Sequence, residues 1–260
     1  MNVPMGAGVT ACMTARSGGV SPPPWDACNL GDHVGDDPER VRHNRAVLAA
    51  CLPARPVFLE QVHGEAVIRL QGGQASDQAP QAIQADGAVC TEPGLACVVM
   101  VADCLPILLS APEGRGVAAL HAGWRGLAGS GPACPSGRGI VHTGVLALCE
   151  ATGADPRDLR AWLGPCIGPQ AFEVGADVLA GFGVSPWASK AAPRFVPRPG
   201  QAGKWLADLP GLAHDRLAAI GVRQVEGGQW CTVSAPGRFF SHRRDGRSGR
   251  QAAAICLNPL

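Results

Sequence analysis

"VADCLPILLSAPEGRGVAALHAGWRG", residues 101–126, contains two apolar segments separated by a short polar stretch. Segments 106–110 and 116–120 predict two strands, and the Pro- and Gly-containing residues 111–115 predict the turn between them. Asp103 and Cys104 interrupt the first apolar run just before its strand begins. An acid beside a thiol in such a run is either tolerated in the core or part of a functional site.

The register of this hairpin decides which side chains meet at its open end. If Ser110 pairs with Gly116, the antiparallel register places Cys104 opposite Ala122. A slip of one residue places Cys104 directly opposite His121. In either register a cysteine and a histidine arrive together where both strands end and loops begin, which is where functional sites are usually built.

The rest of the chain predicts a mixture of strands and helices around this hairpin. Segments 35–52 and 139–153 predict helices, the first capped by Asp36 or Asp37. Segment 56–70 predicts one strand, or two strands that meet at Gly64, and segment 249–258 predicts the last strand. We therefore expect an α/β fold of the layered α+β kind, in a single domain covering residues 1–260.

Composition excludes several classes of protein. A net charge of +1 gives no signal for nucleic acid or for an anionic membrane surface, so we expect neither partner. The N-terminus lacks a secretory h-region, and no apolar run reaches the ~18 residues of a membrane span. Without export, the cytoplasm is the default compartment, and we expect most of the eleven cysteines to be reduced rather than to form a disulfide framework. The expected oligomeric state is a monomer.

Three interpretations of Cys104 and His121 remain open at this point. They are a core thiol and a hydrogen-bonded core histidine, or a nucleophile with its base, or two ligands of a metal ion. A catalytic zinc needs three protein ligands and an open position, and His63 in "LEQVHG" offers the third. The spacing of 41 and 17 residues between the three is not that of a zinc finger, so it does not decide the matter.

Residues beside these positions add candidate contacts for a substrate. Trp124 offers a face for a planar group and Arg125 offers a charge for an anion, although simple packing of Trp124 and a surface charge at Arg125 are the more common explanations. "RFFSHRRDGRSGR", residues 238–250, carries five arginines and His242. Such a run is usually a solvated face, but a small arginine cluster near a site also suits phosphate or carboxylate.

Several ordered motifs resemble those of the YfiH family, which is also described as a laccase domain, a peptidoglycan editing factor and a purine nucleoside phosphorylase. The motifs extend over nearly the whole chain: "TARSGGVS", "NLGDHVGDDPERVRHNR", "LEQVHG", "VADCLPILL", "VAALHAGWRG", "LGPCIGPQAFEVG" and "FFSHRRDGRSGR". The resemblance implies a single-domain fold related to the catalytic domain of cytotoxic necrotizing factor.

The resemblance also implies a metal site made of His63, Cys104 and His121, which are then the catalytic residues as well. Zinc with an open fourth position explains this ligand set with the least strain, so we expect a zinc-dependent enzyme. The implied activity is phosphorolysis of adenosine, inosine, guanosine and methylthioadenosine, with deamination of adenosine, so the partners are a purine nucleoside and phosphate. The substrate-binding residues we expect from it are Arg16, Asn29, His33, Asp103, Trp124, Arg125 and His242. Among these, Arg16 and Arg125 are expected to hold phosphate and Trp124 to stack on the purine.

Copper chemistry is the alternative that the laccase name implies. A laccase needs a mononuclear and a trinuclear copper site rich in HxH motifs, whereas this chain has seven histidines and no HxH. Copper would bind a Cys–His site tightly in vitro whatever the physiological metal is. A third reading, that of a cysteine or metal hydrolase acting on peptidoglycan precursors, also stays open.

The chain departs from the family pattern in two places. An extra stretch, "SGPACPSGR" at 130–138, follows the "HAGWRG" motif and predicts a longer loop beside the site that alters substrate access. His242 stands where the family usually has tyrosine, so a role for a tyrosine hydroxyl is in doubt. A histidine there can still donate a hydrogen bond, with a charge that varies near neutral pH.

Overall fold

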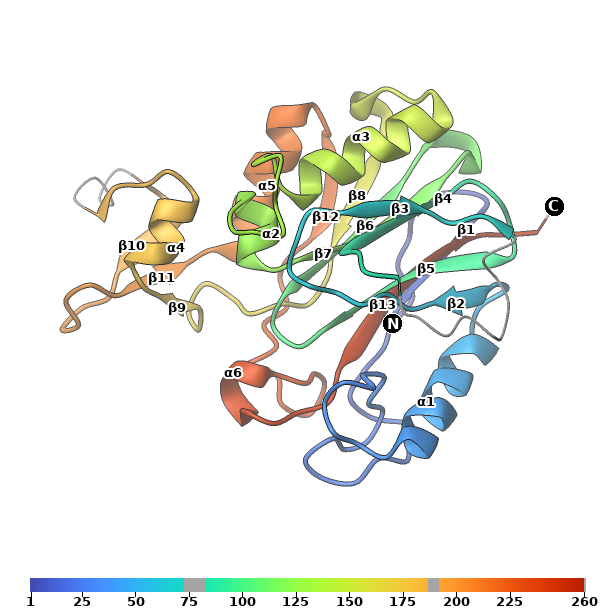
Figure 1. The fold of residues 1–260 in the computed structure, drawn as a ribbon, viewed down its shortest axis with the longest axis horizontal. Helices are drawn as coiled ribbons and strands as arrows, with labels where there is room; N and C mark the ends of the chain where they lie inside the picture. Colours follow the sequence, from blue (N-terminus) through green and yellow to red (C-terminus); the bar gives the residue numbers. More distant parts are fainter. Residues whose placement is uncertain (73–82, 187–191, 260) are drawn as a thin grey trace.

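Two sheets packed face to face form the centre of the protein, with helices on both outer sides (Figure 1). The computed structural model describes residues 1–72, 83–186 and 192–259. The first sheet has the order β1-β13-β5-β2, and the second has the order β12-β8-β6-β7-β4-β3. These elements span β1 Val9–Met13, β2 Arg55–Val57, β3 Val67–Arg69, β4 Gly87–Cys90, β5 Leu95–Val101, β6 Leu105–Ser110, β7 Val117–Ala122, β8 Arg160–Leu163, β12 Gln224–Gly227 and β13 Gln251–Leu257.

Period-two burial explains why the central strands lack a polar face. In β5, Cys97, Val99 and Val101 face the second sheet, while Val98 and Met100 face the opposite side of the first sheet. Every residue of β4, β5, β6, β7 and β13 is buried. Strands covered on both faces read as continuous apolar runs rather than as alternating ones. The architecture is therefore helix, sheet, sheet, helix, a mixed α/β arrangement as expected.

The helices cover the outer face of each sheet (Figure 1). Helix α1 packs on the first sheet, and α2, α3 and α5 pack on the second. The helices span α1 Pro38–Ala50, α2 Trp124–Ala128, α3 Ile140–Thr152, α4 Ala176–Gly181, α5 Leu209–Ile220 and α6 His242–Asp245. Asp37 caps α1 by accepting from the Glu39 amide at 2.9 Å. A three-stranded sheet of β9 Glu173–Val174, β10 Phe195–Pro197 and β11 Trp205–Ala207 lies beside α4.

The structure confirms the predicted hairpin but corrects its register. Ser110 pairs with Val117, and Pro106 pairs with His121, one residue away from the predicted alignment and opposite to the slip we considered. The connection between the two strands, residues 111–116, is one residue longer than predicted, and the Ala111 amide donates to the Gly116 carbonyl at 2.9 Å within it. Pro106 belongs to the regular β6–β7 ladder, so its side chain and that of its partner His121 lie on the same face of the sheet.

Segment 56–70 forms two strands, and they belong to different sheets. β2 pairs with β5 in the first sheet, and β3 pairs with β4 in the second. Residues 58–66 between them cross from one sheet to the other and carry His63. Helices at 38–50 and 140–152 and the last strand at 251–257 confirm the other elements predicted above.

Candidate metal centre and substrate cavity

Cys104 and His121 lie on one face of the second sheet, at the open end of the hairpin. Because Pro106 pairs with His121, Cys104, two residues earlier, shares the face of the histidine and lies diagonally across from it. Asp103 adopts a left-handed backbone conformation with φ of 91°, which turns the chain from β5 into β6. Of the two registers considered from the sequence, the one that pairs Ser110 with Gly116 would have placed the two side chains on opposite faces.

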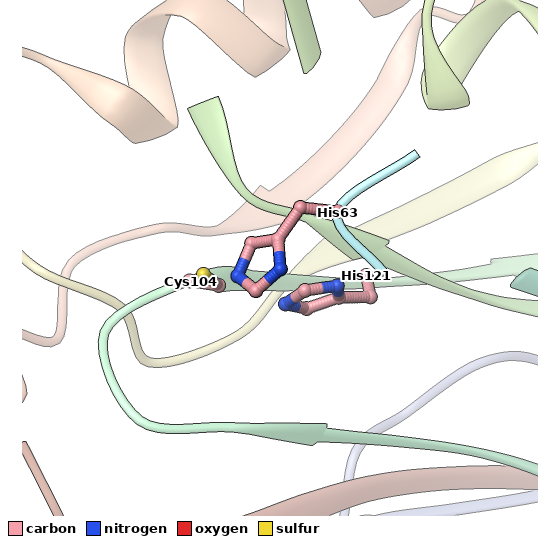
Figure 2. Close-up of side chains that lie close together, drawn as sticks. All are labelled: His63, Cys104 and His121. Atoms are coloured by element: carbon pink, nitrogen blue, oxygen red, sulfur yellow. The ribbon is translucent and has the colours of Figure 1, made fainter. Parts of the chain in front are cut away.

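His63 reaches the same place from the crossing segment 58–66. Its ring contacts that of His121 with the centroids 4.8 Å apart and the planes nearly perpendicular. Figure 2 shows the two imidazole rings and the Cys104 sulfur pointing toward one another. One potential ligand atom from each of these three residues lies within 4.8 Å of the other two.

Gly123 leaves the space that this convergence needs. A Cβ atom at this position would lie 2.8 Å from Cδ2 of His63 and 3.3 Å from Sγ of Cys104. Only glycine therefore fits between the two side chains without displacing one of them. The "HAGWRG" motif thus supplies both a candidate ligand and the gap for its neighbours.

Asp86 is a functional candidate that the sequence analysis missed. Its fully buried carboxylate contacts Nδ1 of His121 at 2.8 Å. It also accepts backbone amides from Val62 at 3.2 Å, His63 at 2.9 Å and Gly64 at 2.7 Å. One side chain therefore orients His121 and fixes the turn that carries His63. The only signal in the sequence was an acid directly before an apolar strand.

Charge interactions within this cluster are strong. Burial opposes ionisation of the Cys104 thiol, but His121 and His63 outweigh it and lower its pKa to about 6. Burial likewise opposes protonation of His121, but Cys104 and Asp86 outweigh it and raise its pKa to about 9. The metal-free cluster is therefore a thiolate and an imidazolium at neutral pH. Burial raises the pKa of Asp86, but His121 and the backbone amides lower it overall.

The cluster fits a zinc ion with an open position. Tetrahedral zinc with bonds of about 2.0–2.3 Å separates its ligand atoms by about 3.3–3.8 Å, which small rotations of the three side chains would reach. Asp86 occupies Nδ1 of His121 and leaves Nε2 for the metal, the usual arrangement of a carboxylate behind a histidine ligand. His63 is exposed and Cys104 partly exposed, so a metal held by these residues would be accessible to solvent.

The cluster lies in the wall of a cavity of about 970 Å³. Five of the expected substrate-binding residues line this cavity together with the three candidate ligands: His33, Asp103, Trp124, Arg125 and His242. Arg125 stacks over the Trp124 ring, with its guanidinium carbon 4.3 Å from the ring centre. His242 is exposed at the first turn of α6. The cavity also contains polar residues that we did not expect, among them Gln61, Arg243 and Arg250.

Arg16 and Asn29 do not belong to the lining of this cavity. Arg16 donates to the carboxylate of Asp26 at 2.9 Å and lies over Phe240. Asn29 is fully buried, and its amide accepts from the backbone of Gly31 and of Arg250 at 2.9 Å each. Both side chains therefore hold segments of the protein together in this structure.

Asp103 lines the cavity, but both of its carboxylate oxygens already accept hydrogen bonds. Oδ1 accepts from the Thr232 hydroxyl at 2.5 Å and Oδ2 from the Arg243 amide at 2.6 Å. Its carbonyl accepts from the Ile167 amide at 2.9 Å. Asp103, which directly precedes Cys104, is thereby hydrogen-bonded to three segments that are far away in the sequence.

The extra stretch at 130–138 packs behind the His63 turn. The Glu65 carboxylate accepts the amides of Ser136 and of Gly139, the latter at 2.9 Å, and the Glu65 amide donates to Ala133 at 3.1 Å. None of residues 130–138, all of which the structure describes, lines the cavity. The stretch therefore braces the segment that carries His63, and its effect on substrate access stays a prediction.

Comparison with known proteins identifies the family. The family model described as multi-copper polyphenol oxidoreductase laccase matches residues 10–258. A relative from Escherichia coli (strain K12), named purine nucleoside phosphorylase YfiH, is 44% identical over 256 residues, covering 98% of this chain and 96% of the relative. The chain belongs to the YfiH family. Another relative, from Pseudomonas aeruginosa and also named a purine nucleoside phosphorylase, is 43% identical with the same coverage.

Solved structures of the YfiH family share this fold. A Neisseria meningitidis protein has a TM-score of 0.85 at 39% identity, covering 100% of this chain and 99% of that protein. A Bacillus licheniformis protein named YfiH has a TM-score of 0.84 at 30% identity, covering 96% of this chain and 93% of that protein. The layered α/β fold and the family that the motifs resemble are both confirmed.

Two further expectations concern the whole chain. All eleven cysteines lie in the described residues, and none of them is paired in a disulfide there. In the described part of the chain, the helices are too short or too polar to cross a bilayer.

Proposed function

We propose that the protein is a zinc-dependent purine nucleoside phosphorylase that also deaminates adenosine. The observation that carries the proposal is the convergence of His63, Cys104 and His121 in the wall of a cavity of about 970 Å³. Such a volume lies near the upper end of the range of about 300–1,000 Å³ typical of small-molecule sites. The names of the relatives at 41–44% identity support a nucleoside and phosphate as substrates.

The donor set supports zinc rather than a laccase copper centre. Seven histidines without an HxH motif are too few and wrongly spaced for a mononuclear and a trinuclear copper site. Within the described residues, His63, Cys104 and His121 form the cluster of metal-ligating groups. Because copper would bind a Cys–His site tightly by the Irving–Williams order, copper loading in vitro would not establish a copper enzyme.

The mechanism assigns each residue of the cavity a separate task. When bound to His63, Cys104 and His121, zinc supplies a Lewis acid that polarises a water or phosphate oxygen. Asp86 contacts Nδ1 of His121 and so leaves Nε2 as the nitrogen that would bind the metal. In phosphorolysis a phosphate oxygen bonds to C1′ of the ribose while the bond from C1′ to the base breaks, and the base leaves with the electron pair.

The remaining residues bind and orient the substrates. Trp124 packs against the planar purine, and Arg125 draws the anionic co-substrate to the mouth of the cavity. His242 offers a ring N–H to the substrate in place of the hydroxyl that a tyrosine would present. His33 also belongs to the polar lining of the cavity. Asp103 holds the turn before Cys104 in place.

A second candidate, a cysteine hydrolase acting on peptidoglycan precursors, is favoured by one observation. Burial opposes ionisation of Cys104, but the neighbouring imidazoles lower its pKa to about 6, so the metal-free thiolate is a competent nucleophile. A metal-bound thiolate cannot be a free nucleophile at the same time. The two functions therefore exclude each other at this site.

The proposal also includes a monomeric, cytoplasmic protein with one domain over residues 1–260. The kinship of this fold with the catalytic domain of cytotoxic necrotizing factor, which the motif resemblance implies, belongs to the proposal too. Gel filtration coupled to light scattering checks the monomer.

The decisive experiment measures metal content and products together. Protein purified without added metal is analysed for zinc and copper, and adenosine is incubated with and without phosphate. We expect close to one zinc per chain, ribose 1-phosphate and adenine only with phosphate, and inosine from deamination. Cys104→Ala should lose zinc and activity, whereas Cys51→Ala, at an exposed thiol beyond α1, should keep both. Full activity in Cys104→Ala would refute the mechanism.

Covalent labelling of the same proteins distinguishes the hydrolase from the phosphorylase. If Cys104 is a nucleophile, zinc-free protein forms a covalent adduct with an electrophilic substrate analogue, and Cys104→Ser abolishes it. If Cys104 is a ligand, zinc protects it from the same reagent. No product from adenosine under either condition would favour the hydrolase.

A further inference from the structure

Arg250 is a partly buried cation in the cavity wall that forms no ion pair with the described residues. Within the described residues, no carboxylate oxygen lies within the 4.0 Å of its guanidinium that defines an ion pair. Arg45, in the same cavity, pairs with Asp32 at 3.1 Å. Because buried charges in proteins are normally paired, an unpaired guanidinium facing a cavity indicates a ligand of opposite charge.

The surrounding backbone holds Arg250 in a fixed position. Its amide donates to Oδ1 of Asn29 at 2.9 Å, and its carbonyl accepts from the Leu30 amide at 3.0 Å. Its side-chain stem packs on Gly31, where a Cβ would lie 2.7 Å from Cγ of the arginine. All three contacts come from the segment "NLG" at 29–31. The arginine is therefore positioned before any ligand arrives.

Only part of the guanidinium is used by the protein. Nη1 donates to the carbonyls of Ser248 at 3.0 Å and Gly249 at 3.1 Å. Nε and Nη2 make no hydrogen bond to the described residues. These two nitrogens form one edge of the planar fork, the edge that binds two oxygens of a carboxylate or phosphate side by side.

The charges of Cys104 and Asp103 also act on the guanidinium of Arg250. Burial lowers the pKa of its guanidinium, while Cys104 and Asp103 act in the opposite direction. Arginine nevertheless stays protonated at any physiological pH, so the charge remains in the cavity wall. An anion bound there would share the cavity with the Cys104 cluster.

We propose that Arg250 binds a phosphate group in the cavity that holds His63, Cys104 and His121, and that Asn29 is the residue that positions it. As the site of the co-substrate, this inference rests on the proposed phosphorylase function. The phosphate group has two sources, inorganic phosphate and the phosphate of a nucleoside monophosphate. Arg125 is exposed and stacks on Trp124, which suits it to attract the anion rather than to enclose it.

The test is a binding measurement that needs no turnover. Isothermal titration of the zinc-loaded protein at constant ionic strength measures inorganic phosphate, adenosine 5′-monophosphate and adenosine separately. Arg250→Gln removes the charge, and Arg250→Lys keeps the charge but removes the fork. Arg157→Gln is the matched control, because its side chain is 63% exposed and it pairs with Asp155 outside the cavity. Circular dichroism of each variant confirms that it is folded.

Losing a charged hydrogen-bonding partner should weaken phosphate binding at least about tenfold in Arg250→Gln. Arg250→Lys should bind phosphate with an intermediate affinity, and adenosine should bind all variants equally. Weakening of inorganic phosphate identifies the free anion as the ligand. Weakening of the monophosphate alone identifies a phosphorylated substrate. Unchanged binding of both in Arg250→Gln overturns the proposal.

The positioning role of Asn29 and the proposed activity are tested separately. Asn29→Ala should raise the phosphate dissociation constant while leaving that of adenosine unchanged, and an equal effect on both would indicate a merely structural role. If Arg250→Gln loses phosphate binding but no adenosine is cleaved by the wild type, the site stands and the phosphorylase fails. If the wild type cleaves adenosine and Arg250→Gln keeps its KM for phosphate, the reverse holds.

Discussion

Replacing Asp86 with Asn tests whether one buried carboxylate builds the metal centre. Oδ1 contacts His121 Nδ1 and the His63 amide, and Oδ2 accepts the amides of Val62 and Gly64. The asparagine amide has one oxygen, so it can replace only one side of this arrangement. If its NH2 group faces His121, the imidazole must accept at Nδ1 and carry its proton on Nε2, the nitrogen that the metal needs.

The size of the effect follows from these contacts. Loss of the partner behind a histidine ligand typically costs about 10–100-fold in metal affinity, or about 1.4–2.7 kcal/mol. If the amide turns the other way, its NH2 group faces two backbone donors. At least one buried donor is then left unsatisfied, at about 1–3 kcal/mol of stability in the metal-free protein. The variant therefore loses metal affinity, stability or both.

Competition with a chromophoric zinc chelator measures the affinity, and urea unfolding of the metal-free protein measures the stability. The pKa of Asp86 is lowered on folding, so its contribution is present above the pKa of an unfolded carboxyl and is lost as the pH falls through the folded value. The stability difference between wild type and Asp86→Asn should therefore shrink in acid. Asp158→Asn, at an exposed position away from the cavity, is the control. Wild-type zinc affinity together with wild-type stability would refute the reasoning.

Three further changes probe the same site. Alkylation of Cys104 in the metal-free protein should accelerate as the pH rises to about 6 and then level off, because its imidazole neighbours outweigh burial; a continued rise toward pH 9 would contradict this, and zinc should block the reaction. Gly123→Ala should lower zinc affinity at least about tenfold in a chelator competition, because the new Cβ would lie 2.8 Å from Cδ2 of His63; unchanged affinity would mean that the ring moves aside freely. Thr232→Val removes a buried 2.5 Å hydrogen bond to Asp103 and should cost about 1–3 kcal/mol in urea unfolding, whereas wild-type stability would show that water replaces the hydroxyl.

Local patterns in the sequence were sufficient to predict most of the secondary structure. Asp37 and Pro38 mark the start of α1, and the apolar runs of β6, β7 and β13 are long enough to identify each strand. The pairing register was not predictable, because it depends on how many residues the turn uses. The Ala111 amide closes the turn on Gly116, and this one hydrogen bond shifts the whole ladder by one residue. A shift of one residue moves each side chain to the opposite face relative to its partner, which is why Cys104 and His121 meet.

The crossing of segment 58–66 between two sheets was not predictable either. An apolar pattern interrupted at Gly64 is compatible with a hairpin, a bent strand or a crossing, since periodicity records burial and not the identity of the neighbouring strand. In the structure, the Gln61 amide group donates to the Met100 carbonyl at 2.8 Å and accepts from the Met100 amide at 2.7 Å, which fixes the crossing segment to β5. The contacts that place His63 near Cys104 therefore join residues that are far apart in the sequence: Gln61 with Met100, 39 positions apart, and His63 with Asp86, 23 positions apart.

Residues that act by positioning others are the ones that sequence reasoning misplaces. Asn29 was expected to touch substrate because it lies in a motif, yet its oxygen accepts from Arg250, 221 residues away. Asp86 was overlooked because an acid before a strand has no chemistry of its own until His121 is opposite it. A motif records that a residue type is needed at a position, but only the fold determines whether the need is for a ligand or for the side chain that holds the ligand-binding group. For this protein the distinction can be measured. A positioning residue changes the affinity for phosphate only through its partner, so its replacement has no further effect once that partner has been removed. Asn29→Ala should therefore have little further effect on phosphate binding in an Arg250→Gln background, whereas additive losses would mean that Asn29 contacts the phosphate group itself.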